Sequence, residues 1–385
     1  MKFLIVKLSA IGDVIHALPV PAYLKKAVPG CTVTWLIEKP SAGLVTNNPA
    51  IDEVIVFGGK RWFKEAGQPG AWLKNFGEAQ QFFQNLRDAR YDAVLELQGL
   101  LKSSLLARAS GAKVVAGFDD TREFADRFLT HRLNVGNYFG HDVPVVELNL
   151  SVAKFALKLL SLEAPDLPVE FPLPILQPEV DVKISALLKS EKCLVSSAAS
   201  TPNTPSVPNL GSSSSNPIYI VLIPGTTWVT KIWPESKWIE LGQQLSDQYG
   251  CELVLVGGPS ETKSNAVIAS GIKAARPDSI VRNLTGETTL LELIDLFRRS
   301  ALVIGGDTGP LHLAAATGVP KVVGVFGSTP ARRNGPYGPQ CETVNLSLEC
   351  QPCYSKTCKF NTVACLTDLD AVQVFAAAQR ANIAR

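Results

Sequence analysis

The residues best suited to chemistry gather in one loop in the last third of the chain. Residues 305–316 read GGDTGPLHLAAA and follow the unbroken apolar run 301–304, which predicts a strand buried on both faces and a sharp glycine turn behind it. Asp307 and Thr308 are helix-capping types, and Pro310 suits a first helical turn. Free amides and the partial positive charge of such a helix start would bind phosphate or pyrophosphate. The alternative is that Asp307 and Thr308 only cap a structural helix.

A second candidate is Asp13, in the loop 9–14 behind the apolar residues 3–6. Open α/β sheets bind ligands at the carboxyl ends of their strands, so this loop would face a ligand. A carboxylate at a helix start stays ionised at neutral pH, which suits a general base that takes a proton from a hydroxyl. The alternative is that Asp13 only caps its helix.

A third loop, residues 224–234 (PGTTWVTKIWP), again follows a predicted buried strand. Thr226 and Thr227 supply hydroxyls and Lys231 supplies an ammonium, a combination that fits phosphate although the spacing is not that of a P-loop. Glu261, in a further glycine-containing turn, could bind ribose hydroxyls or a base, or could be a solvated carboxylate at a helix start.

Strands and helices must position these loops. The apolar runs predict strands at 3–6, 32–37, 52–57, 91–97, 218–223, 252–256, 301–304 and 322–326. Helical patterns lie between them, among them 14–26, bent by Pro19 and Pro21, and 79–90. Alternating strands and helices imply parallel sheets, and the restart at 218 implies two doubly wound α/β domains.

We therefore divide the chain into three parts. A first domain spans 1–175, and a junction spans 176–217 with a Ser/Pro-rich, disordered insertion over about 195–217. A second domain spans 218–385 and ends in a cysteine-rich tail and a final helix.

Bulk properties agree with two domains and exclude some classes of protein. The chain has 385 residues, of which 46% are hydrophobic, and a formal net charge of +2. The length suits two domains, and so small a charge gives no reason to expect a nucleic-acid partner. No apolar run approaches the roughly 18 residues of a membrane helix. We expect a cytoplasmic protein with reduced cysteines.

Four of the cysteines form a C-x2-C-x4-C-x6-C pattern, namely Cys350, Cys353, Cys358 and Cys365. By ligand count they could bind Zn²⁺ or an Fe–S cluster, but the spacing departs from the two tight pairs of a usual zinc ribbon. Reduced structural thiols or a disulfide are the alternatives, so the metal question stays open, and we do not assign the cluster to the chemistry.

Taken together, these motifs resemble glycosyltransferase family 9, the bacterial heptosyltransferases of lipopolysaccharide core assembly, and most of all its heptosyltransferase I branch. The resemblance covers nearly the whole chain apart from the Ser/Pro-rich insertion. Its most specific pieces are 7–16 (KLSAIGDVIH), 224–234 and 306–312 (GDTGPLH). It implies a GT-B fold, in which two Rossmann-like doubly wound domains face a cleft, with the acceptor on the first and the nucleotide sugar on the second.

The resemblance also implies a reaction, the inverting transfer of heptose from ADP-heptose to the Kdo region of a lipopolysaccharide core acceptor. Asp13 and Lys231 would be catalytic, as the base and as the cation that neutralises the leaving diphosphate. The donor site would contain Ser9, Gly12, Thr226, Thr227, Lys231, Glu261, Asp307, Thr308, Gly309 and His312.

No cofactor would be required, because these groups already neutralise the diphosphate. A metal-dependent enzyme would want an Asp-x-Asp pair in the cleft. The only such pair in the sequence, Asp368 and Asp370, starts the final helix, where its charges favour the helix dipole.

The acceptor would be an acidic glycolipid of Kdo-lipid A type, held by residues that resemble the basic loops and a histidine motif of the family: Lys60, Arg61, Lys64, Arg122 and His141. Charge-assisted hydrogen bonds are about twice as strong as neutral ones, while solvated surface charge is the alternative for each residue. Residues 60–64 (KRWFK) also combine aromatic and basic groups, which fits peripheral contact with the cytoplasmic face of the inner membrane.

Three other functions stay open at this point. A family member could use a different nucleotide sugar or acceptor. A sugar-nucleotide 2-epimerase of the same architecture would bind nucleotide and transfer nothing to a glycan, which the basic loop 60–64 argues against. A catalytically inactive glycan-binding protein is disfavoured by the presence of Asp13 and Lys231.

Overall fold

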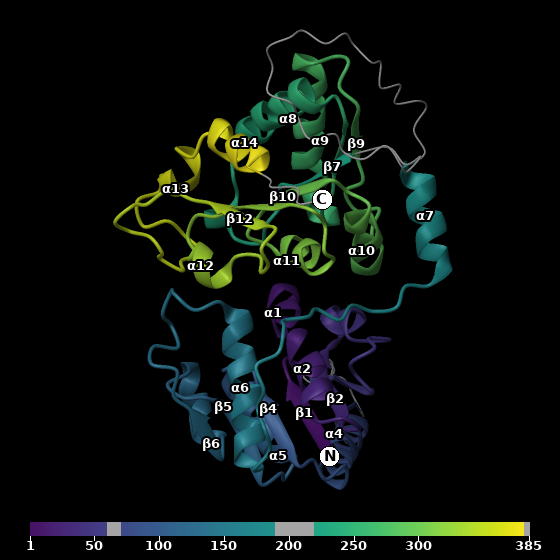
Figure 1. The fold of residues 1–385 in the computed structure, drawn as a ribbon, viewed down its shortest axis with the longest axis vertical. Coiled ribbons are helices and arrows are strands. Elements are labelled where there is room, and N and C mark those ends of the chain that lie inside the picture. Colours follow the sequence, from purple (N-terminus) through teal and green to yellow (C-terminus); the bar gives the residue numbers. More distant parts are fainter. Residues whose placement is uncertain (60–70, 189–218, 381–385) are drawn as a thin grey trace. The chain divides into compact units, whose positions relative to one another are not determined.

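The computed structural model describes residues 1–59, 71–188 and 219–380, and the chain divides into two compact units, Met1–Leu176 and Gln177–Arg385 (Figure 1). The Ser/Pro-rich insertion predicted over 195–217 lies outside the described residues. Each unit is an α/β structure built on one parallel sheet.

The first unit carries a six-stranded sheet in the order β3-β2-β1-β4-β5-β6. Every pair of neighbouring strands in it is parallel, and in the middle of the sheet Ile5 lies between Trp35 and Leu95. The strands are β1 (Lys2–Val6), β2 (Thr32–Glu38), β3 (Glu53–Phe57), β4 (Ala93–Glu96), β5 (Val114–Phe118) and β6 (His131–Leu133). This is the strand order of a Rossmann domain.

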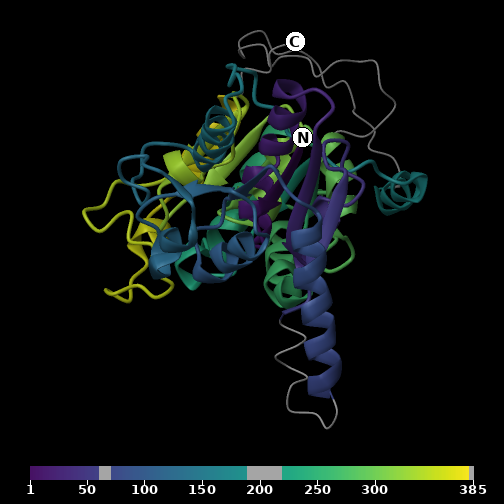
Figure 2. The same ribbon diagram turned by 90° about the horizontal axis from the view of Figure 1, so that it is seen from below.

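Helices flank this sheet: α1 (Ile11–Ala17), α2 (Pro19–Ala27), α4 (Ala71–Asp88), α5 (Leu101–Ala109) and α6 (Val145–Leu159), with the 3-10 turns η1 (Lys39–Leu44) and η2 (Arg122–Phe128). The predicted bent helix over 14–26 is in fact two helices that meet at Leu18, because Pro19 starts α2 and has no N–H to continue α1. The helix predicted at 79–90 begins earlier, at Ala71, and Figure 2 shows α4 extending past the other elements of its unit.

The second unit repeats the same plan. Its parallel sheet has the order β12-β11-β10-β7-β8-β9, which is the Rossmann order read from the other edge. The strands are β7 (Tyr219–Ile223), β8 (Glu252–Leu255), β9 (Val281–Asn283), β10 (Leu302–Gly306), β11 (Val322–Val325) and β12 (Cys341–Val344). Sequence analysis identified neither β9 nor β12, the outer strands of this sheet, which are short and not continuously apolar. In the first unit it identified neither β5 nor β6.

The helices of the second unit are α7 (Pro178–Leu188), α8 (Glu235–Tyr249), α9 (Thr262–Ala275), α10 (Leu290–Arg298), α11 (Gly309–Ala316), α12 (Ala331–Asn334), α13 (Ala364–Thr367) and α14 (Ala371–Gln379), with the turns η3 (Val229–Lys231) and η4 (Pro259–Glu261). Its core includes the perpendicular rings of Trp233 and Trp238, whose centroids lie 5.0 Å apart, and α14 packs beside α8 (Figure 1).

One boundary differs from the prediction. Residues 176–217 were expected to form a junction, yet the described part of that segment forms α7 and packs on α10 of the second unit. The Lys183 ammonium lies 3.0 Å from a Glu292 carboxylate oxygen, and Arg299 pairs with Asp181. These ion pairs and the buried Ile184 fix α7 to that unit.

The two sheets place the predicted loops at equivalent points. In each sheet the strand order reverses beside its first strand, between β1 and β4 in one and between β7 and β10 in the other. Ligands of open α/β sheets bind at such switch points, outside the carboxyl ends of the strands. Asp13 follows β1, Lys231 follows β7 and Asp307 follows β10. No helix within the described residues has the length and apolarity needed to cross a bilayer.

Candidate active site

A buried ion pair forms the centre of the site in the second unit. The Lys231 ammonium lies 2.6 Å from Asp307 Oδ2, and the two side chains are only 14% and 6% exposed. His312 Nε2 lies 3.6 Å from the other carboxylate oxygen, Oδ1. The Thr329 hydroxyl donates a hydrogen bond of 2.5 Å to Oδ2. The loops behind β7, β10 and β11 and the start of α11 therefore meet at one carboxylate.

The surroundings of Asp307 keep it ionised. Burial by itself would raise the pKa of this carboxyl, because charge is costly away from water. The neighbouring His312 and Lys231 outweigh that effect and hold the pKa of Asp307 well below its ordinary value. The carboxylate can thus orient a lysine and a histidine at neutral pH.

Asp307 does not cap the following helix. Helix α11 has Thr308 as its N-cap, with an extended backbone, and Pro310 lies in the first turn as predicted. Thr308 and Gly309, at the start of α11, are half-buried and directly follow Asp307 in the chain. This arrangement places a cation and a helix start at one location.

Two glycines permit close approaches in the same region. A side chain at Gly306 would meet the Thr226 methyl carbon at 2.8 Å, and one at Gly225 would meet the Glu261 carboxylate at 1.9 Å. Glu261 also accepts a 2.6 Å hydrogen bond from the Gly258 amide. The structure therefore brings Glu261 against the loop behind β7, whereas Thr227 in that loop is exposed.

In the first unit, Asp13 both caps a helix and keeps acceptor capacity. Its Oδ2 accepts a hydrogen bond of 3.2 Å from the Ala10 amide, so the capping interpretation is correct as far as it goes. The side chain is half-buried, and within the described residues Oδ1 accepts no hydrogen bond. Ser9 and Gly12 belong to this same loop and helix start, and so to the first unit.

Gln98, which sequence analysis missed, holds this loop in place. Its Oε1 accepts hydrogen bonds from the Leu8 and Ser9 amides at 3.0 and 3.3 Å. Its own amide donates to the buried Glu96 carboxylate at 2.9 Å. Gln98 follows β4, the strand beside β1. A polar residue directly behind a buried strand is the sequence feature that could have identified it.

Thr329 was missed for a similar reason. It follows β11 in a short loop of small polar residues, Ser328 and Thr329, behind a continuously buried strand. The rule that selected Asp307, a polar residue just after a buried strand, would also have selected Thr329.

The predicted acceptor residues are only partly described. Arg122 stacks on the Phe139 ring, with 5.4 Å from its guanidinium carbon to the ring centroid, and Phe139 is two residues from His141. Both Arg122 and His141 are exposed. Arg122 begins the turn η2 behind β5, and His141 lies in the loop behind β6. Lys60, Arg61 and Lys64 lie outside the described residues.

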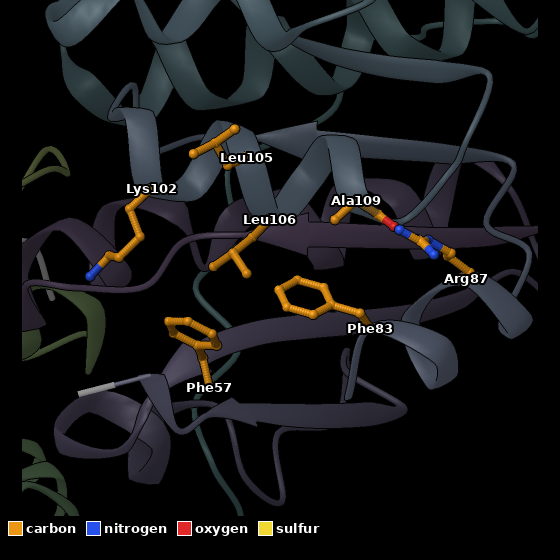
Figure 3. Close-up of a pocket in the computed structure, with 7 residues that line it drawn as sticks. All are labelled: Phe57, Phe83, Arg87, Lys102, Leu105, Leu106 and Ala109. Atoms are coloured by element: carbon orange, nitrogen blue, oxygen red, sulfur yellow. The ribbon is translucent and has the colours of Figure 1, made fainter. Parts of the chain in front are cut away.

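A separate cavity of about 390 Å³ lies between β3, α4 and α5 of the first unit (Figure 3). Its walls are the apolar side chains of Phe57, Phe83, Leu105, Leu106 and Ala109, with Lys102 and Arg87 at opposite ends. Lys102 pairs with the buried Glu38, and Arg87 donates to the Ala109 carbonyl at 3.2 Å. None of the predicted site residues lines this cavity.

Two motifs of the sequence could be suspected of binding a metal, the Asp368–Asp370 pair and the four clustered cysteines. Asp370 is the N-cap of α14 and pairs with Lys237 at 2.5 Å, as expected for a helix start. Cys350, Cys353, Cys358 and Cys365 carry free thiols. Across residues 1–59, 71–188 and 219–380, no group of three or more His, Cys, Asp or Glu side chains is arranged to hold a metal ion.

Comparison with known proteins assigns the family. The family model for glycosyltransferase family 9 (heptosyltransferase) matches residues 79–364. Lipopolysaccharide heptosyltransferase 1 of Pseudomonas aeruginosa is 31% identical over 360 residues, which is 94% of this chain and 88% of that protein.

Solved structures agree. The Escherichia coli heptosyltransferase WaaC with ADP is 26% identical, covers 98% of this chain and 100% of its own, and gives a TM-score of 0.68. The same enzyme with ADP-2-deoxy-2-fluoro heptose gives 0.66 at the same identity, over 98% of this chain and 99% of its own. These matches and the paired Rossmann-order sheets confirm the predicted GT-B fold class. The chain belongs to glycosyltransferase family 9, and it is a glycosyltransferase.

Proposed function

We propose that this protein transfers heptose from ADP-heptose to the Kdo region of a lipopolysaccharide core acceptor, with inversion at the anomeric carbon. The observation that carries the proposal is the buried Lys231–Asp307 pair beside the start of α11, at the switch point of the second unit. The similarity to the Pseudomonas heptosyltransferase and to WaaC with ADP and a fluorinated ADP-heptose supports the choice of donor.

The reaction needs an anionic group that accepts a proton and a cationic group that stabilises the leaving diphosphate. An acceptor hydroxyl oxygen forms a bond to the anomeric carbon, and the bond from that carbon to the diphosphate oxygen breaks. The hydroxyl proton passes to Asp13, and ADP leaves with the bonding electron pair. General-base assistance of this kind contributes about 10² to 10⁴ in rate.

Lys231 would stabilise the leaving diphosphate. A diphosphate gains negative charge as it departs, and a fixed cation in a partly buried site stabilises that charge more than water does. Asp307 would not face the diphosphate directly. It would orient Lys231 and His312, while the amides of Thr308 and Gly309 and the hydroxyls of Thr226 and Thr227 complete the donor site.

The acceptor side of the proposal rests on the family motifs. Arg122 and His141 would meet the acidic sugars, together with Lys60, Arg61 and Lys64 outside the described residues. Because an acceptor of the Kdo-lipid A type is lipid-anchored, we place the enzyme in the cytoplasm, in peripheral contact with the inner membrane. We also propose that the transfer needs no metal or other cofactor, because the donor site carries its own cations.

The test is to follow nucleoside diphosphate release from ADP-heptose, and separately from UDP- and GDP-sugars, with and without a Kdo-bearing acceptor. The proposal predicts ADP release that depends on both ADP-heptose and the acceptor. Release from a UDP- or GDP-sugar instead would replace the donor. Release without any acceptor would indicate hydrolysis or epimerase-like chemistry and would overturn the proposal.

A further inference from the structure

The segment 350–358, which carries three of the clustered cysteines, packs on the loops of the donor site. Thr230, the residue before Lys231, donates a hydrogen bond of 2.5 Å from its hydroxyl to the Ser355 carbonyl. The Tyr354 amide donates a hydrogen bond of 2.9 Å to the carbonyl of Ser328, the residue before Thr329. The cysteine segment, as we call residues 350–358, is thus hydrogen-bonded beside two residues that contact Asp307.

This packing brings a second lysine to the site. The Lys231 ammonium lies 4.5 Å from the centroid of the Trp228 ring, and the Lys356 ammonium lies 5.5 Å from the same centroid. A cation over an indole ring is attracted by the negative face of the π-system, which limits the positions that a long side chain samples. The indole ring of Trp228 is therefore shared by two ammonium groups, which come from two loops that are distant in sequence.

The charges of this group do not cancel. Lys231 has Asp307 as its partner, whereas among the described residues no carboxylate lies within ion-pair distance of the exposed Lys356. Lys356 thus adds a positive charge beside Trp228, which lies in the loop that also carries Lys231. An added positive charge beside the loop that holds Lys231, near a helix start, favours a multiply charged anion.

We propose that Lys356 is a second donor-binding lysine, whose ammonium contacts the diphosphate of the nucleotide sugar. The inference rests on the proposed function, because it takes the ligand of this site to be a nucleoside diphosphate. It also gives the cysteine segment a role: the segment fixes Lys356 beside Trp228 through the hydrogen bonds of Ser355 and Tyr354. Sharing the growing charge between two lysines would assist departure of the diphosphate.

The decisive comparison is between Lys356→Ala and Lys359→Ala. Lys359 is also an exposed lysine, three residues further along, and its ammonium lies 4.8 Å from the centroid of the Phe360 ring. Calorimetric dissociation constants would be measured for ADP and for AMP, which lacks the second phosphate. Loss of one charge-assisted contact predicts about a tenfold weaker affinity for ADP in Lys356→Ala.

The same proposal predicts a smaller loss for AMP, recovery of most of the ADP affinity in Lys356→Arg, and no change beyond about twofold in Lys359→Ala. If Lys356→Ala binds ADP like the parent while Lys231→Ala binds it weakly, the role of Lys356 is wrong and the proposed function stands. If the parent protein itself binds no ADP, both proposals fail. Equal losses in Lys356→Ala and Lys359→Ala would mean a general electrostatic effect and would also overturn the specific contact.

Discussion

The Lys231 ammonium and the Asp307 carboxylate form an ion pair of 2.6 Å in which the two side chains are only 14% and 6% exposed. Two charges removed from water stabilise a protein only while both are present, because either one alone is left without compensation. The pair therefore links the stability of the second unit to the chemistry that we assign to it.

Replacing Asp307 by Asn should lower the free energy of unfolding by about 3 kcal/mol, since Lys231 would keep a buried charge without its partner. Urea unfolding of the parent and the variant at pH 7 measures the difference. Asp370→Asn is a suitable control, because Asp370 pairs with Lys237 at an exposed helix start and should cost about 1 kcal/mol or less. Equal losses in the two variants would contradict the importance of the buried pair.

The same pair predicts how stability depends on pH. The pKa of Asp307 is lower in the folded than in the unfolded protein, so its contribution is fully present above the ordinary carboxyl pKa of about 4 and is lost as the pH falls further. The parent should lose stability more steeply than Asp307→Asn between about pH 5 and pH 2. Parallel pH profiles for the two proteins would show that Asp307 does not contribute in this way.

Thr329 is expected to act through Asp307. Thr329→Val removes the hydroxyl that donates to Oδ2, so the carboxylate should bind Lys231 more tightly and present it less well to the donor. We expect the KM for the nucleotide sugar to rise by about fivefold to tenfold. Thr329→Ser should restore it, because serine keeps the hydroxyl.

Thr317→Val gives the matched control for Thr329, since the Thr317 hydroxyl donates at 2.6 Å to a backbone carbonyl at the end of α11, away from Asp307. Steady-state kinetics with varied donor would separate KM from kcat in all three variants. An unchanged KM in Thr329→Val would remove Thr329 from the donor site.

The sequence was sufficient to predict most strands and the loops that follow them. Continuous apolar runs such as Tyr219–Ile223 mark strands buried on both faces, and polar residues directly behind them reach the switch point. The short outer strands β6, β9 and β12 escaped prediction because tertiary pairing, rather than local pattern, makes them strands. The inner strand β5 was also missed, although all five of its residues are buried.

The partners of each site residue could not be predicted in the same way. Thr329 is 22 residues from Asp307, and Ser355 is 125 residues from Thr230. Contacts over such separations depend on how the loops pack, and the periodicity and spacing of residues in the sequence do not predict that packing. Asp13 is the instructive intermediate case, since the sequence offered capping and catalysis as alternatives and the structure makes it a cap with one oxygen to spare.

Asp13→Asn should lower kcat by at least about a hundredfold, because the asparagine amide cannot take the proton from the hydroxyl of the acceptor substrate. The substitution keeps an oxygen for the Ala10 amide, so the fold of α1 should be preserved. Asp166→Asn, which changes an exposed carboxylate paired with Lys154, should leave kcat unchanged. An Asp13→Asn enzyme as active as the parent would eliminate Asp13 as the base.

Treatment with EDTA should leave the transfer rate unchanged, because lysine, hydroxyl and amide groups are proposed to neutralise the diphosphate. The rate would be measured before chelation, after chelation, and after return of Mg²⁺, Mn²⁺ or Zn²⁺. Strong inhibition that a divalent ion reverses would contradict the metal-free proposal.

The most direct measurement of the central claim, that Lys231 in the second unit holds the diphosphate while Asp13 serves the acceptor, is the affinity for ADP by calorimetry in Lys231→Ala and Asp13→Asn. We predict that the dissociation constant rises at least about tenfold in Lys231→Ala and stays within about twofold of the parent in Asp13→Asn. Parent-like ADP binding by Lys231→Ala, or a comparable loss in Asp13→Asn, would contradict the account.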